Sequence, residues 1–129
     1  MPCHDKEISV LIDARTIPDY AEPVEAGDIK EGLIYFAVQY LDSGMRVPQL
    51  EALVFLGRNL APGDVGQCYF QDAGSYREGV RFGVPASDQD PTAIFYNQHE
   101  KELNHIFEFD RALDELLRCS SRRRARNVP

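Results

Sequence analysis

The residues with the clearest potential for metal chemistry lie at positions 99–105, where the sequence reads HEKELNH. Two histidines four residues apart share one face of a helix and can bind zinc together. Here the residue four positions after His99 is Leu103, and the surrounding residues favour strands over a helix. Two histidines at a turn rarely hold a metal without further ligands, so we predict no metal site and no cofactor.

Two potential nucleophiles, Cys68 and Ser75, are better explained by structural roles. Cys68 lies within a predicted strand, where a cysteine usually packs as a small apolar residue. Ser75 follows that strand but lacks the G-x-S-x-G spacing of a nucleophile elbow, so we expect helix capping there. The nine glycines form neither a phosphate loop nor a dinucleotide fingerprint. We therefore assign no catalytic residue and favour a non-catalytic role.

Binding of a small ligand in a pocket is the main alternative function, and several polar residues could take part in it. Such a pocket would lie between the sheet and the loops of residues 16–32 and 81–91, and it could serve binding or an enzymatic reaction. Near the predicted short helix, Tyr76, Arg77 and Arg81 could face an anionic group. Ordinary ion pairing with Glu78 or Asp72 explains the two arginines better. The candidate ligand-binding residues are Tyr76, Arg77, Tyr96 and His105.

The C-terminal arginines form the only strongly basic segment of the chain. Residues 118–129 contain five arginines and no acid, which leaves residues 1–117 with 9 basic and 21 acidic residues, a net charge of −12. An acidic body repels phosphate backbones, and no aromatic residue is interleaved to stack on bases. We therefore rank nucleic-acid binding as a third alternative, beside contact with an acidic partner or a second copy. The candidate residues are Arg122, Arg123, Arg124 and Arg126.

Composition predicts one globular domain that builds its own core. The chain has 129 residues, of which 43% are hydrophobic and 27% charged, as is usual for a globular domain. Three scattered cysteines do not suggest a disulfide framework, and no apolar run is long enough to cross a membrane. We expect a cytoplasmic protein whose domain covers residues 1–123, followed by a frayed basic tail at 124–129.

Two apolar runs organise the predicted fold. Residues 33–41 are apolar on both alternating faces, which is typical of a strand covered on both sides, and we predict that this strand is central. Residues 50–56 form its neighbour. Alternation predicts a further strand at residues 8–13, and turn residues at 61–66 precede another strand at 67–71. Residues 16–32 contain too few apolar side chains for a buried element and predict a surface loop, which could be mobile.

The second half of the chain predicts a short helix, a hairpin and a long helix. Asp72 can cap a helix that ends at Gly79. Residues 92–109 fit a β-hairpin with its turn at 99–102, in which Tyr96 would face His105. Asp110 can cap a final helix that packs on the sheet through one stripe of side chains, Ala112, Leu113, Leu116 and Leu117.

The sequence as a whole predicts an α+β fold. We expect an antiparallel or mixed sheet of about five or six strands, with a short helix after residue 71 and a C-terminal helix on one face. The function that fits best is a small non-catalytic binding or accessory protein, which acts through a protein partner or through self-association.

Overall fold

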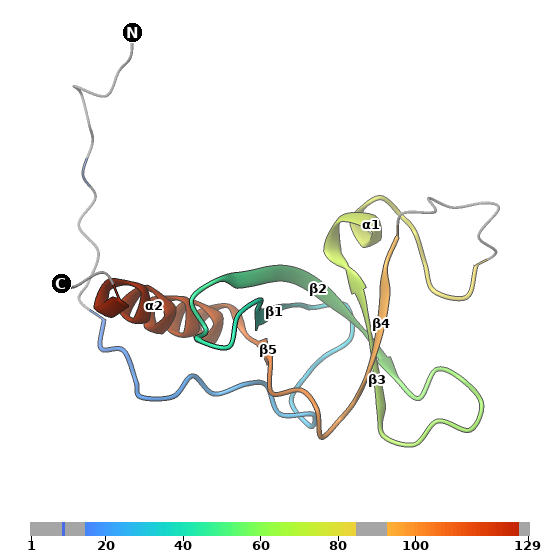
Figure 1. Cartoon of the computed structure of the whole chain (residues 1–129). Helices are drawn as coiled ribbons and strands as arrows, with labels where there is room; N and C mark the ends of the chain where they lie inside the picture. Colours follow the sequence, from blue (N-terminus) through green and yellow to red (C-terminus); the bar gives the residue numbers. More distant parts are fainter. Residues whose placement is uncertain (1–8, 10–14, 85–92, 127–129) are drawn as a thin grey trace, which may run out of the picture.

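The computed structural model describes residue 9, residues 15–84 and residues 93–126, which form one sheet and two helices (Figure 1). The five strands are antiparallel, which confirms the α+β class. The strand expected at residues 8–13 lies outside the described residues, apart from Ser9. In chain order the elements are β1 (Ile34–Tyr40), β2 (Pro48–Arg58), β3 (Gln67–Asp72), α1 (Ala73–Arg77), β4 (Phe95–His99), β5 (Ile106–Phe107) and α2 (Phe109–Arg126).

The strand order is β4-β3-β2-β1-β5, so β2 is the central strand. The expectation that residues 33–41 form the centre is therefore wrong, although β1 buries side chains on both of its faces. Tyr35 and Ala37 are buried on one face, while Val38 is buried on the other. The second face is covered because α2 packs on it, together with Ala21 of the preceding loop. A strand near the edge can thus look central when a helix lies over it.

The hairpin expected at residues 92–109 does not form, because β4 and β5 lie at opposite edges of the sheet. Strand β4 pairs with β3, and β5 pairs with β1. The turn at 99–102 is present, with Glu102 N donating to His99 O at 2.8 Å. A second turn follows, in which Ile106 N donates to Leu103 O at 3.0 Å, and it directs the chain across the sheet instead of back along β4.

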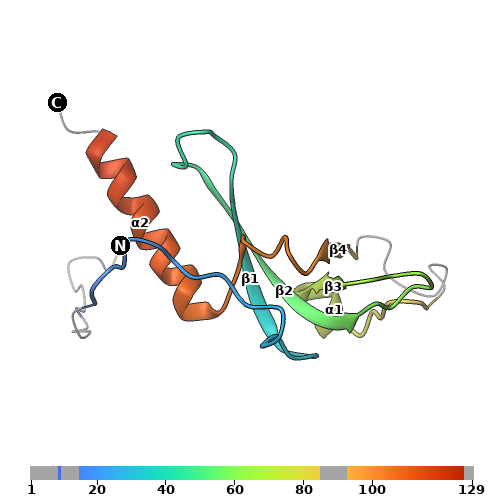
Figure 2. The same cartoon turned by 90° about the horizontal axis from the view of Figure 1, so that it is seen from below.

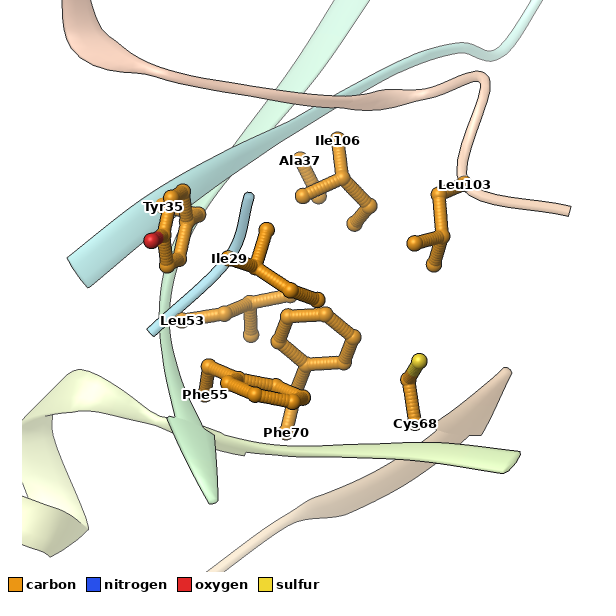
Figure 3. Close-up of a cluster of buried hydrophobic side chains, with 9 residues drawn as sticks. All are labelled: Ile29, Tyr35, Ala37, Leu53, Phe55, Cys68, Phe70, Leu103 and Ile106. Carbon is orange, nitrogen blue, oxygen red and sulfur yellow. The ribbon is translucent and has the colours of Figure 1, made fainter. Parts of the chain in front are cut away.

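The inner face of the bent sheet holds the larger core. Buried side chains from β1, β5 and the loops lie opposite those of β2 and β3 (Figure 3). Phe55 and Phe70 pack ring against ring, with centroids 5.4 Å apart. The fully buried Cys68 lies in the same cluster, as expected for a structural cysteine. The cluster contains Ile29, Tyr35, Ala37, Leu53, Phe55, Cys68, Phe70, Leu103 and Ile106.

The loop of residues 16–32 contains no helix or strand, as predicted, but it is packed against both cores. Ala21 and Ile29 are 1% and 6% exposed, and Val24 N donates to Ile106 O at 2.8 Å. The loop thereby covers the outer edge of β5. Although the loop has too few apolar residues for a buried helix or strand, two of them suffice to anchor it on the sheet.

Helix α1 forms as local capping rules predict. Asp72 accepts a hydrogen bond from Ser75 N at 2.9 Å, and Gly79 follows the helix with φ +98°, a conformation that glycine adopts easily. The Ser75 hydroxyl donates to Asp72 Oδ1 at 2.7 Å, so capping explains this serine. Asp72 also accepts from Ile94 N at 2.8 Å, which fixes the start of β4 beside α1.

Helix α2 runs beside the β1–β2 hairpin (Figure 2). It begins at Phe109, one residue before the predicted cap Asp110, and it extends to Arg126, into the segment expected to fray. Its buried side differs from the predicted stripe. Ala112 is buried as expected, but Leu113, Leu116 and Leu117 are only partly buried, while the fully covered residues beside Ala112 are Asp114, Glu115 and Cys119.

The buried acids of α2 are held by arginines. Arg15 Nε donates to Asp114 Oδ1 at 2.8 Å, and Arg111 lies 3.1 Å from the other carboxylate oxygen. A buried carboxylate is tolerated when cations and hydrogen bonds compensate its lost hydration. Among the described residues, neither helix has the length and apolarity of a membrane-spanning segment.

Candidate functional site

The four residues expected to bind a ligand lie in separate places. Tyr76 borders one hollow and His105 borders another. Arg77 is exposed in the last turn of α1. Tyr96 borders neither hollow. Its hydroxyl oxygen lies 2.7 and 2.8 Å from the two carboxylate oxygens of Glu51, to which it donates. Burial, followed by this hydrogen bond, raises the pKa of Tyr96 to about 12, so it links β4 to β2 as a neutral phenol.

The first hollow, which we call the loop hollow, has a volume of about 550 Å³. Residues of both loops named in the ligand hypothesis border it, together with residues of β2 and α1. The Arg81 guanidinium lies 3.9 Å from the centroid of the Tyr76 ring, and Arg81 Nη1 donates to Tyr76 O and Val80 O, both at 2.8 Å. The lining residues are Glu31, Gly32, Phe55, Leu56, Leu60, Tyr76, Arg81 and Phe82.

The second hollow, which we call the helix hollow, has a volume of about 490 Å³ and is lined by residues of β1, β5, α2 and three loops. Its apolar wall is made by Ala21, Val38 and Phe107, which pack with Ala112 of α2 in a second, smaller core. Its polar wall is made by residues from four segments of the chain. A hollow with an apolar wall and a few convergent polar groups is typical of a small-ligand site. The lining residues are Tyr20, Ala21, Val38, Gln39, Tyr40, Met45, Asn104, His105, Phe107, Glu115 and Arg118.

A network of four side chains around Glu115 borders the helix hollow. The Tyr40 hydroxyl donates to Glu115 Oε2, which also accepts from Arg122 Nη2 at 3.1 Å. Arg118 Nη1 donates to Glu115 Oε1 at 2.9 Å. Arg122 Nη2 donates to the Tyr40 oxygen as well, at 2.8 Å. We call these four residues the Glu115 network; it satisfies both oxygens of a carboxylate that is only 6% exposed.

The network keeps Tyr40 neutral. Burial, then the hydrogen bond to Glu115 and the charge of that carboxylate, raise the pKa of Tyr40 well above its usual value, and the nearby Arg122 lowers it only in part. The phenol therefore acts as a hydrogen-bond donor at all physiological pH values. Tyr40 joins β1 to α2, because its hydroxyl reaches residues two turns apart on the helix.

His105 also borders the helix hollow. Burial lowers the pKa of His105, so the imidazole is neutral at pH 7. Its backbone is fixed, because His105 O accepts from Val38 N at 2.9 Å. A neutral imidazole at the edge of a hollow can both donate and accept one hydrogen bond.

The C-terminal arginines differ in their contacts. Arg122 Nε donates to Met45 O at 2.9 Å, and Arg123 Nη1 donates to Arg46 O at 2.7 Å, so both bind the tip of the β1–β2 hairpin. That tip is shaped by Asp42, whose carboxylate accepts from Val47 N and Arg46 N. Arg124 Nη1 donates to Ser120 Oγ at 3.2 Å within the helix, and Arg126 is the last residue of α2.

The outer face of β1 and β2 exposes apolar side chains between the two helices. The register places Val38 beside Leu50, Phe36 beside Ala52 and Ile34 beside Val54 on this face. Helix α2 covers Val38 and α1 contacts β2, but Ile34 and Leu50 are each 51% exposed. The Phe109 ring, 66% exposed, lies edge-on to Phe36 at 5.7 Å. We call Ile34, Phe36, Leu50, Ala52 and Phe109 the outer apolar face.

The residues considered for metal binding do not converge. The part of the chain that the structure describes contains no group of three or more His, Cys, Asp or Glu side chains placed to hold a metal ion. His99 Nδ1 accepts from Lys101 N at 3.1 Å, a contact within its own turn. His99 and His105 lie at the two ends of the link between opposite sheet edges, so the hairpin that would have paired them is absent.

Neither the Glu115 network nor the outer apolar face could be predicted from the sequence. Tyr40 and Glu115 are 75 residues apart, and no spacing rule connects a strand residue with a distant helix residue. A weak signal was available in α2, where Glu115, Arg118 and Arg122 occur at intervals that place them on one side of a helix. Ile34 and Leu50 alternate with their neighbours as core residues do. A strand pattern does not reveal whether a helix covers such residues, so their exposure could not be predicted.

Comparisons with known proteins do not assign the chain to a family: no protein-family model, no curated protein and no solved structure matches it.

Proposed function

We propose that this protein is a non-catalytic binding protein of the cytoplasm that holds a partner protein on the outer apolar face. The observation that carries the proposal is the exposure of Ile34 and Leu50 on one sheet face, where the half-buried Phe36 and Ala52 lie between them and the exposed Phe109 packs on Phe36. Soluble proteins rarely leave a contiguous group of large apolar side chains uncovered, and such groups mark interaction surfaces.

The shape of the surface favours a helix as the partner element. Helices α1 and α2 lie at opposite ends of the sheet (Figure 1), and both pack on the face that carries Phe36 and Val54. A third helix between them would complete a layer of helices on the sheet, which is a common arrangement in α+β domains. Its apolar stripe would cover Ile34 and Leu50, as in helix-in-groove recognition.

Charge adds a second property of the partner. The chain carries a net charge of −7, and the exposed acids Glu108 and Asp110 flank Phe109 at the edge of the face. Opposite charge at the rim of an interface accelerates association and suppresses wrong partners. We therefore propose an amphipathic helix with basic residues beside its apolar stripe.

The cytoplasmic location is supported by the cysteines of the described chain. Cys68 and Cys119 are buried free thiols. Unpaired buried thiols fit a reducing compartment, whereas secreted domains of this size commonly use disulfides.

Substitutions in a purified complex test the proposal. Leu50→Ser and Ile34→Ser should each weaken binding of the partner by about tenfold or more, as for anchors near the centre of an interface. Leu41→Ser is the matched control, because Leu41 is 70% exposed but lies at the hairpin tip. The proposal fails if Leu41→Ser weakens binding as strongly, or if neither serine in the face has an effect.

A second function, binding of a small ligand, is supported by the two hollows. The loop hollow lies between the sheet and both loops named in the sequence-based hypothesis, and Tyr76 borders it. Nucleic-acid binding through the C-terminal arginines has less support, because Arg122 and Arg123 use guanidinium donors for contacts within the chain.

A further inference from the structure

The helix hollow has a charge balance that differs from the rest of this acidic protein. Of its described lining residues, Glu115 and Arg118 carry charge at neutral pH, and Arg122 binds the same carboxylate from the side of Tyr40. Two guanidinium groups thus share one carboxylate, which leaves one uncompensated positive charge. In a chain of net charge −7, this local excess of positive charge favours the binding of an anion.

Arg118 has hydrogen-bonding capacity to spare. Its Nη1 donates to Glu115 Oε1, whereas its Nε and Nη2 have no partner among the described residues. Its side chain is 27% exposed, and the residue borders the hollow. A guanidinium presents its donors as a rigid planar fork that matches the two oxygens of a carboxylate.

The other lining residues of the helix hollow suit a ligand that carries an apolar body beside a carboxylate. Ala21, Val38 and Phe107 are buried side chains that form the apolar wall. Among the other lining residues, the neutral His105 and the amide of Asn104 offer polar contacts without adding charge. The volume of about 490 Å³ accommodates a ligand of one or two fused rings.

We propose that the helix hollow binds a small amphiphilic monocarboxylate, with its carboxylate on Arg118 and its apolar body against Val38 and Phe107. This inference goes beyond the proposed function, because it concerns a different set of residues and a different class of ligand. The Glu115 network orients Arg118 before the ligand arrives, which lowers the entropic cost of binding.

Titration with 2-naphthoate, followed by amide chemical shifts in NMR, tests the site directly. We expect saturable shifts at Val38 and His105 and a dissociation constant below about 1 mM. The neutral isostere 2-naphthamide should bind at least about tenfold more weakly, because it lacks the charge that Arg118 recognises. Equal binding of the two probes, or the absence of saturable shifts around the hollow, overturns the proposal without any variant.

Two variants localise the binding, and a third serves as the control. Arg118→Gln should weaken 2-naphthoate binding by about tenfold or more, and Asn104→Trp, at an exposed residue that borders the hollow, should obstruct it while leaving Arg118 in place. Arg81→Gln is the matched control, because Arg81 borders the loop hollow. If Arg118→Gln does not fold, Asn104→Trp still decides: unchanged affinity in a folded Asn104→Trp protein contradicts the site. Equal losses in Arg118→Gln and Arg81→Gln would show an unspecific charge effect and would also contradict it.

Discussion

At the scale of single residues, Glu115 determines how α2 is attached to the sheet. Its carboxylate accepts from Tyr40 on β1 and from Arg118 and Arg122 on its own helix. Burying a carboxylate costs free energy that only charge pairing and hydrogen bonds can offset. Removing one member of such a network is expensive, because the remaining groups stay partly buried without their partners.

Glu115→Gln should therefore lower the free energy of unfolding by about 2–3 kcal/mol, since two guanidinium groups lose their shared anion. Urea unfolding monitored by circular dichroism measures this change. Glu108→Gln is the matched control on an exposed acid next to α2 and should change stability by less than about 0.5 kcal/mol. Equal stability of the two variants would contradict the role of the network.

His105 predicts a pH dependence at mildly acidic pH. Because burial lowers its pKa in the folded state, the unfolded chain binds more protons below the unfolded pKa of about 6.5. Stability should thus fall as pH decreases from 7 through 6.5 toward the folded pKa. His105→Gln should reduce this loss in urea midpoints compared at pH 7.5 and pH 5.5, values about one unit either side of 6.5. Asn104→Gln changes no titrating group and should keep the slope of the unmodified protein; a His105→Gln protein with that same slope would refute the assignment.

At the scale of elements, the parts that could be predicted from sequence are those fixed by neighbouring residues. The turn before β3, the Asp72 cap and the end of α1 at Gly79 all follow from local rules. The pairing of β4 and β5 could not be predicted, because alternation does not specify which strand is the partner. The second turn, at 103–106, uses no glycine or proline and gave no signal.

Asp72 joins two elements and should be sensitive to substitution. Burial alone would raise the pKa of Asp72, but hydrogen bonds from Ile94 N and from the hydroxyl and amide of Ser75 outweigh it and lower the pKa. Asp72→Ala removes these acceptors and should cost about 2 kcal/mol in unfolding free energy, at the upper end for a helix cap. Asp72→Asn, which retains an oxygen acceptor, should lose less. Asp19→Ala on the exposed loop is the control, and losses as large as in Asp72→Ala would contradict the capping role.

At the scale of the whole molecule, the two faces of the sheet have different environments. The inner face is filled by a core from β1, β2, β3 and β5, whereas the outer face is covered only in part by α1 and α2. Composition and alternation predicted the fold class because the core residues follow strand periodicity. They could not predict the outer apolar face or the helix hollow, since both depend on where α2 lies.

Two phenylalanines distinguish the core from the proposed surface. Phe70 is fully buried, so Phe70→Ala should lower the free energy of unfolding by about 3–5 kcal/mol through the cavity it leaves. Phe109 is 66% exposed, so Phe109→Ala should cost less than about 1 kcal/mol while weakening the partner complex. Urea unfolding and a binding titration on the same samples separate the two effects. A large stability loss in Phe109→Ala would show that this ring serves the fold instead of a partner.

The most direct test of the outer apolar face is site-specific photo-crosslinking in the native cell. A benzoylphenylalanine at position 109 should crosslink to one protein, through a helix with an apolar stripe and basic flanks, and Leu50→Ser in the same chain should abolish the product. The same group at position 65, which is 79% exposed in the turn before β3, is the control and should give no such product. A crosslink to a second copy would identify self-association on this face in place of a partner helix. Identical products from positions 109 and 65, or a product at 109 that survives Leu50→Ser, would contradict a binding role for the outer apolar face.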